Sequence, residues 1–212
     1  MREGQIRKHV EMEKLFGADF LPISKSLPPS EIDSLRAEVA ACRKCEELCS
    51  RRTQTVFGVG SLRAPLVFVG EAPGEDEDRQ GEPFVGRAGQ LLTKTLQDLG
   101  VPRDRVYIAN ILKCRPPGNR TPKPEEMANC VPYLHRQLRI LAPKIVCVLG
   151  NVAAQNLLDT KTGITKLRGR YQDFNGTRIF ATFHPAYILR NMNEMKYFEA
   201  DLRTVCLDAG LI

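Results

Sequence analysis

The chain has 212 residues, of which 42% are hydrophobic and 26% charged, which is typical of one globular α/β domain plus a short extension. It contains no apolar run of 18 residues and no signal-peptide pattern, so we expect a cytoplasmic protein without a membrane span. Its 31 Lys and Arg outnumber its 25 Asp and Glu, and the resulting net charge of +6 favours a polyanionic partner.

The start of the chain differs in character from the rest. Residues 1–29 mix charges with isolated apolar residues and end in Ser-Leu-Pro-Pro, which predicts an N-terminal extension followed by a folded domain over residues 30–212. From Ser30 onward, an N-capping serine and early acidic residues precede apolar residues at helical spacing. This segment is therefore expected to form a helix that runs into Cys42.

Short apolar runs alternate with helical patterns along the domain. The expected strands are 65–69, 105–112, 144–149 and 178–183, and the expected helices are 87–99, 124–141, 151–158 and 196–207. This alternation predicts an α/β fold, a three-layer α/β/α sandwich with a central four-stranded, mainly parallel sheet.

The stretch from Gly70 to Gly89, GEAPGEDEDRQGEPFVGRAG, joins the first expected strand to its helix. Because open α/β sheets bind ligands beyond the carboxyl ends of their strands, a long loop here is a candidate binding loop. Its acidic residues also suit an ordinary solvated connection. Phe84 does not, since an aromatic ring in so polar a loop must pack inward or stack on a ligand. The glycine spacing matches neither common nucleotide-binding pattern.

Polar residues follow the strands at one expected edge of the sheet. The four strand ends supply Gly70-Glu71-Ala72, Asn110, Gly150-Asn151 and His184. Taken singly, Asn110 can simply cap a turn, and a histidine after a strand is more often structural than catalytic. Their convergence at one edge is what predicts a site.

The seven cysteines form a second constellation. Cys42-x-x-Cys45 is followed much later by Cys114 in a proline-rich loop and by Cys130, and four thiolates suit either tetrahedral zinc or an iron-sulfur cluster. Cys49 is a spare candidate. The remaining two, Cys147 and Cys206, lie in expected apolar elements, where a packing role is favoured.

In combination these motifs resemble the family 4 uracil-DNA glycosylases, iron-sulfur enzymes of bacteria and archaea. The matching pieces are GEAPGEDED with EPFVGRAG, YIANILKCRPPGNRTP, the cysteine set and HPAYILRN, which together run from Cys42 to Asn191. The resemblance implies an enzyme that flips uracil out of DNA, hydrolyses its N-glycosidic bond and so starts base excision repair. It also implies a monomer acting on uracil-containing DNA.

The resemblance further implies a role for each matched position. Gly70, Glu71 and Ala72 would line the uracil pocket, Phe84 would stack on the base, Asn110 would read its edge, and His184 would contact it near the scissile bond. Glu71 and His184 are the implied catalytic pair. A 4Fe-4S cluster with a structural role would be held by Cys42, Cys45, Cys114 and Cys130. Ala72 stands where family 1 enzymes, with GQDPYH, carry a water-positioning aspartate, which favours catalysis by leaving-group stabilisation.

Contacts with DNA are expected from two groups of residues. Tyr187, Ile188, Leu189 and Arg190 follow His184 and can enter the groove with an apolar wedge, although they equally suit a hydrophobic turn packed on the last helix. Candidate phosphate contacts are Arg115, Arg120, Lys123, Lys166, Arg168 and Arg170.

One alternative stays open. A non-catalytic iron-sulfur module that binds DNA or senses redox state would explain the charge and the cysteines without using Asn110 or His184. A related group of glycosylases bonds covalently to DNA through a histidine in an inserted KRRIH-type loop. No such insertion occurs between Arg115 and Glu125, so ordinary turnover is expected.

Overall fold

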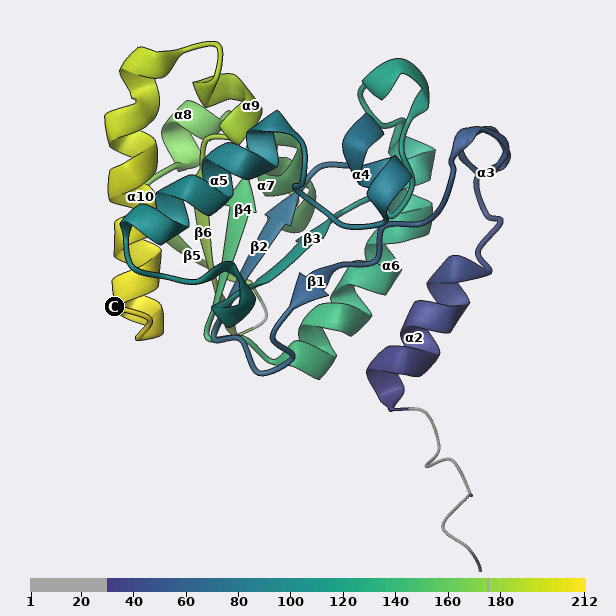
Figure 1. The fold of residues 1–212 in the computed structure, drawn as a ribbon, viewed down its shortest axis with the longest axis horizontal. Helices are drawn as coiled ribbons and strands as arrows, with labels where there is room; N and C mark the ends of the chain where they lie inside the picture. Colours follow the sequence, from purple (N-terminus) through teal and green to yellow (C-terminus); the bar gives the residue numbers. More distant parts are fainter. Residues whose placement is uncertain (1–29, 175) are drawn as a thin grey trace, which may run out of the picture. The chain divides into compact units, whose positions relative to one another are not determined.

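A computed structural model of the protein describes residues 30–174 and 176–212 (Figure 1). Residues 31–212 form one compact unit. The predicted N-terminal extension lies outside the described residues. Within the described ranges, every helix is too short or too polar to cross a lipid bilayer.

The core of the fold is a twisted sheet with strand order β1-β3-β2-β4-β6-β5. Its strands are β1 (Val59–Gly60), β2 (Leu66–Gly70), β3 (Tyr107–Asn110), β4 (Ile145–Leu149), β5 (Tyr171–Phe174) and β6 (Thr177–Thr182). The four inner strands β3, β2, β4 and β6 run parallel. Each of β2, β3 and β4 is buried along its whole length, as expected for strands covered on both faces.

The expected fold class is confirmed, but the described residues form six strands rather than four. The two additional strands lie at the edges and pair antiparallel, β1 with β3 and β5 with β6. β1 is only two residues long, and β5 follows a basic, glycine-containing stretch. Neither carries an apolar run. An edge strand is not buried on both faces, so it need not be apolar along its whole length.

Helices cover both faces of the sheet (Figure 1). They are α2 (Glu31–Ala40), α3 (Glu46–Arg51), α4 (Glu75–Gln80), α5 (Arg87–Asp98), α6 (Pro124–Leu141), α7 (Asn151–Leu157), α8 (Ile164–Leu167), α9 (Pro185–Ile188) and α10 (Met195–Ala209), with short 3-10 turns at Arg103–Arg105, Pro117–Asn119 and Met192–Glu194. Apolar residues of α5 and α10 pack on one face and those of α6, α7 and α8 on the other. α2 packs on the outside of α6 through a third cluster that includes Leu35 and Tyr133.

The parallel strands bring their carboxyl ends to one edge. Gly70 at the end of β2 pairs in register with Asn110 at the end of β3. The ladder continues past both strands, because Ile111 N–H donates to Gly70 O and Leu112 N–H donates to Glu71 O, each at 3.0 Å. The two predicted strand ends are therefore fixed beside each other by main-chain hydrogen bonds.

Candidate active site

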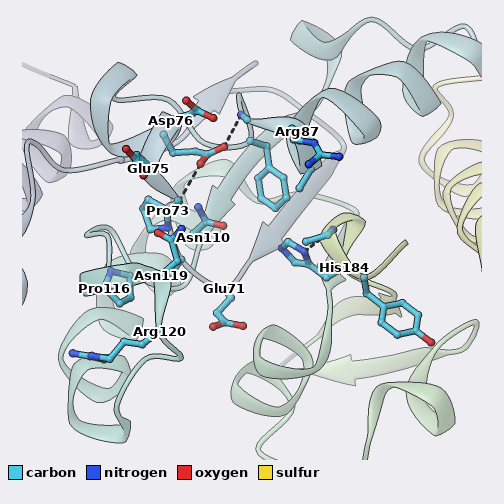
Figure 2. Close-up of a pocket in the computed structure, with 18 of the residues that line it drawn as sticks. Glu71, Pro73, Glu75, Asp76, Arg87, Asn110, Pro116, Asn119, Arg120 and His184 are labelled. Atoms are coloured by element: carbon cyan, nitrogen blue, oxygen red, sulfur yellow. Dashed lines mark hydrogen bonds between the residues drawn. The ribbon is translucent and has the colours of Figure 1, made fainter. Parts of the chain in front are cut away.

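A cavity of about 630 Å³ opens at the carboxyl edge of the sheet. It is lined by the predicted residues Glu71, Ala72, Phe84, Asn110, His184, Tyr187 and Arg190, together with residues of the loop after β2 and of the proline-rich loop. Figure 2 shows Glu71 below Asn110 in the view, with His184 on the right. Gly70 does not line the cavity, but it lies against two side chains that do, those of Asn110 and Phe84.

Asn110 presents an unused hydrogen-bond acceptor. Its side chain is 2% exposed, and its Oδ1 has no hydrogen-bond partner among the described residues. A buried acceptor left without a donor costs about 1 to 3 kcal/mol. Such an atom at the wall of a cavity indicates that a ligand supplies the missing donor.

The Phe84 ring is held in a cradle of glycines. Phe84 has a left-handed backbone with φ of 55°, uncommon outside glycine, and its side chain is buried. A Cβ on Gly70 would overlap Asn110 Oδ1 and lie 2.5 Å from Phe84 Cζ, and a Cβ on Gly89 would overlap the Phe84 backbone. The ring centroid lies 5.6 Å from that of His184. These contacts place one aromatic face at the cavity wall.

The backbone on each side of Phe84 is fixed by a charged side chain. Glu77 Oε1 accepts hydrogen bonds from the N–H groups of Val85 and Gly86, at 2.9 and 2.8 Å, and its Oε2 accepts from Gly74 N–H at 3.1 Å. Arg103 donates to Pro83 O at 2.5 Å. One carboxylate thus ties both ends of the loop after β2 together, while a guanidinium holds the carbonyl just before Phe84.

His184 is a neutral imidazole with a defined tautomer. Its Nδ1 accepts a hydrogen bond from Ala186 N–H at 3.1 Å, so the ring proton lies on Nε2. Burial, with a smaller contribution from the nearby Arg190 charge, lowers the pKa of His184 to about 4. His184 therefore offers an uncharged N–H donor to the cavity throughout the neutral range.

Glu71 is the cavity carboxylate nearest the end of β2. Burial raises the pKa of Glu71 above its usual range. No hydrogen bond or ion pair engages its side chain within residues 30–174 and 176–212. It is therefore available to a developing positive charge or to a water molecule in the cavity.

The segment after His184 divides into exposed and buried residues. Tyr187 is 37% exposed and Arg190 is also exposed, whereas Ile188 is fully buried in the same core cluster as Phe84. Leu189 is half-buried. The expectation that Ile188 can serve as a wedge in DNA does not fit this burial, because its side chain is part of the core.

Most of the basic residues expected to contact phosphate already have acidic partners. Four of the six are in ion pairs, which are Arg115 with Glu75, Arg120 with Glu47 and Glu126, Lys123 with Glu47, and Arg168 with Asp201. Lys166 and Arg170 are exposed and have no ion pair within the described part of the chain. These two are the clearer candidates for phosphate contacts.

The predicted cysteine set converges at a second site, between the turn after α2 and the start of α6. One pocket is lined by Cys42, Cys45, Cys49, Cys114 and Cys130, all with free thiols. Among residues 30–174 and 176–212, no group of three or more His, Cys, Asp or Glu is arranged to hold a single metal ion. Cys147, in β4, and Cys206, in α10, are buried in the core cluster between the sheet and the helices α5 and α10, as expected for packing residues.

Hydrogen-bond donors surround the sulfur atoms of three cysteines. Arg52 donates to Cys114 Sγ at 2.9 Å, Lys113 N–H donates to Cys130 Sγ at 3.3 Å, and Asn129 donates to Cys45 Sγ at 3.6 Å. Hydrogen bonds of this kind stabilise thiolate ligands in iron-sulfur sites. Burial raises the pKa of Cys114 to about 12, so binding of a metal there must displace the thiol proton. The donor set therefore fits an iron-sulfur group.

Four residues that support these sites were not identified from the sequence: Glu77, Arg103, Arg52 and Lys113. Glu77 belongs to an acidic run that suits a solvated loop, although its spacing from Gly74 follows the capping-box pattern. Lys113 interrupts an apolar stretch directly before Cys114, and its side chain is only 1% exposed. The two arginines carry no sequence signal, because their partners are distant in the chain.

A parallel α/β sheet with a ligand cavity at its carboxyl edge defines a broad class of enzymes and binding proteins. Within it, the chain belongs to the uracil-DNA glycosylase superfamily, since residues 57–205 match the family described as "Uracil DNA glycosylase superfamily". A type-4 uracil-DNA glycosylase of Archaeoglobus fulgidus is 43% identical over 182 residues, which cover 82% of this chain and 91% of that protein. One of Thermotoga maritima is 48% identical over 161 residues, 74% of this chain and 83% of that protein.

Proposed function

We propose that the protein is a type-4 uracil-DNA glycosylase, which flips uracil out of DNA and hydrolyses its N-glycosidic bond to start base excision repair. The observation that carries the proposal is the buried, unpartnered Oδ1 of Asn110 at the cavity wall. Uracil N3–H is a donor that satisfies this atom. Family membership and the type-4 relatives support the same activity.

Asn110 and Phe84 would select and hold the base. The Asn110 side chain accepts from N3–H and donates to O4, whereas cytosine presents the opposite pattern at both atoms. The Phe84 face would return about 1 to 3 kcal/mol of the stacking that a flipped base loses. Gly70, below both side chains, allows them to approach each other, and Ala72 at the rim adds no acidic group.

His184 and Glu71 would lower the barrier to bond cleavage. As the bond breaks, negative charge develops on the uracil ring and positive charge on the sugar. The Nε2–H of His184 donates to uracil O2 without transferring its proton, and the Glu71 carboxylate faces the cationic sugar and orients water. Loss of a donor of this kind typically lowers the rate by about a hundredfold to a thousandfold.

Cys42, Cys45, Cys114 and Cys130 would hold a 4Fe-4S cluster. When bound, this group would crosslink the segment between α2 and α3, the proline-rich loop and α6 through its thiolate ligands, and so supply structural stability rather than reaction chemistry. Cys49 lies in the same pocket, but its Sγ donates to Cys42 O at 3.5 Å, which suits a free thiol.

DNA would be bound beside the cavity mouth. Tyr187, Leu189 and Arg190 are the residues of the segment after His184 that we retain as groove contacts, and Lys166 and Arg170 as phosphate contacts. A single chain supplies every proposed pocket residue, so a monomer suffices. Seven free thiols suit the reducing cytoplasm.

The experiment is cleavage of a single-uracil oligonucleotide followed by alkali, which breaks abasic sites. Wild type is compared with Asn110→Ala and with Asn156→Ala, whose side chain contacts Met127 rather than the cavity. We expect Asn156→Ala to match wild type and Asn110→Ala to lose at least about a hundredfold in kcat/KM. An intact, iron-loaded wild type that leaves the oligonucleotide uncut would contradict the proposal and favour the non-catalytic DNA-binding module.

A further inference from the structure

Lys113 is almost completely buried, which is rare for a lysine. Its side chain is 1% exposed, although charged side chains are almost never fully buried unless they are paired. Its Nζ makes one hydrogen bond, to the main-chain O of Asn110, at 2.8 Å. No carboxylate within residues 30–174 and 176–212 forms an ion pair with it. The protein groups around it thus leave the ammonium without a counter-charge.

The carbonyl that accepts from Lys113 belongs to the residue whose side chain enters the cavity. β3 ends at Asn110, and the next N–H, that of Ile111, donates to Gly70 O. The Asn110 carbonyl is the last one of β3, and it accepts from the ammonium of Lys113. The backbone that aims Asn110 into the cavity is therefore fixed by a lysine only three residues along the chain.

The backbone of Lys113 is connected to the cysteine site. Its N–H donates to Cys130 Sγ at 3.3 Å, and the next residue is Cys114, whose Sγ accepts from Arg52 at 2.9 Å. Four thiolates around an iron-sulfur group would bring negative charge close to the lysine. Because a buried charge is tolerated only when it is paired, the cluster would supply the counter-charge that the ammonium otherwise lacks.

We propose that Lys113 is a positioning residue that couples the cysteine site to base recognition, with its ammonium held between the anionic cluster and the Asn110 carbonyl. The inference rests on the proposed glycosylase function and on a cluster bound by the four cysteines. Coupling between two sites is reciprocal. A uracil base in the cavity therefore stabilises the bound cluster by as much as the cluster strengthens uracil binding, and we expect this stabilisation to slow cluster loss.

The test measures release of iron from the cluster-loaded protein by a chelator, followed through the visible absorbance of the cluster. The protein is saturated with an oligonucleotide carrying 2′-fluoro-deoxyuridine, whose glycosidic bond resists cleavage, or with the same oligonucleotide carrying thymine. In wild type we expect the uracil oligonucleotide to slow iron release at least about fivefold relative to the thymine one.

Variants at Lys113 separate coupling from packing. Lys113→Met keeps the length and apolar stem of the side chain but removes the charge, so we expect faster iron release and no difference between the two oligonucleotides. Lys113→Arg keeps the charge and should restore most of the uracil effect. Lys144→Met removes an exposed lysine just before β4, outside the cavity, and should behave as wild type.

Two outcomes would overturn the coupling. One is a wild type that cleaves uracil normally but releases iron equally fast with both oligonucleotides. The other is a Lys113→Met variant that keeps the full uracil effect. Should Lys113→Met fail to fold, Asn110→Ala in otherwise unchanged protein serves instead, and retention of the uracil effect there counts against the proposal. A wild type that cleaves no uracil would instead remove the proposed function itself.

Discussion

Gly70 and Asn110 are paired in register at the ends of β2 and β3, and the Asn110 side chain occupies the space that a Cβ on Gly70 would need. Such a Cβ would overlap Asn110 Oδ1. The Phe84 ring closes the same space from the other side. The orientations of the Asn110 amide and of the Phe84 ring thus depend on residue 70 being a glycine, which has no Cβ.

Gly70→Ala is accordingly expected to displace both side chains. Insertion of a methyl group into a packed site typically costs about 1 to 3 kcal/mol of unfolding free energy. Displacement of Asn110 should lower kcat/KM for uracil by at least about tenfold, because small misplacements of binding groups are costly. Denaturant unfolding and oligonucleotide cleavage measure the two effects. Gly163→Ala is the matched control, since a Cβ there meets nothing within 4 Å, and equal losses in both variants would contradict the prediction.

Glu77→Gln should loosen the loop that presents Phe84. The variant replaces one carboxylate oxygen by an amide nitrogen, which cannot accept from the N–H groups that Glu77 now satisfies. A buried N–H left without its acceptor costs about 1 to 3 kcal/mol, and we expect KM for uracil-DNA to rise more than kcat falls. Steady-state kinetics on single-uracil DNA provide the measurement. Asp98→Asn, at an exposed carboxylate of α5 outside the cavity, should leave both constants near wild type.

The pH dependence of His184 follows from its lowered pKa. With a folded-state pKa of about 4, the Nε2–H donor stays neutral from pH 5 upward, so His184 should add no titration to kcat/KM between pH 6 and 8. Unfolded chains protonate histidine near pH 6.5. Because the unfolded state then binds the proton first, His184 should reduce the free energy of unfolding as pH falls from about 6.5 to 4. NMR titration of the imidazole checks the pKa, and a midpoint above pH 6 would exclude this assignment.

Cys114→Ala should lose iron and stability together. Metal binding to a site of this kind is linked to folding, so a missing ligand lowers the midpoint of thermal unfolding as well as the iron content per chain. Cys49→Ala is the control from the same pocket and should keep both. Iron analysis, visible absorbance and thermal unfolding of the two variants decide the matter. Full iron content in Cys114→Ala would remove Cys114 from the ligand set.

Several features could be derived from the sequence because they are local or periodic. The inner parallel strands follow from short apolar runs bounded by proline and glycine, and the long helices from their 3.6-residue spacing. The convergence of Glu71, Asn110 and His184 follows from strand order alone, because parallel strands end at one edge. The cysteine pocket follows from four thiol positions that match a known family pattern.

Other features were decided only by the tertiary structure, because they depend on contacts between residues far apart in the chain. The edge strands β1 and β5 exist through pairing and carry no apolar run of their own. Ile188 is core while its neighbour Tyr187 is exposed, and Arg120 is paired with Glu47, 73 residues away. The tautomer of His184 and the link from Lys113 to Asn110 each rest on a single hydrogen bond. Composition and periodicity indicate which residues are buried, but the partner that each buried polar group finds is set by the fold.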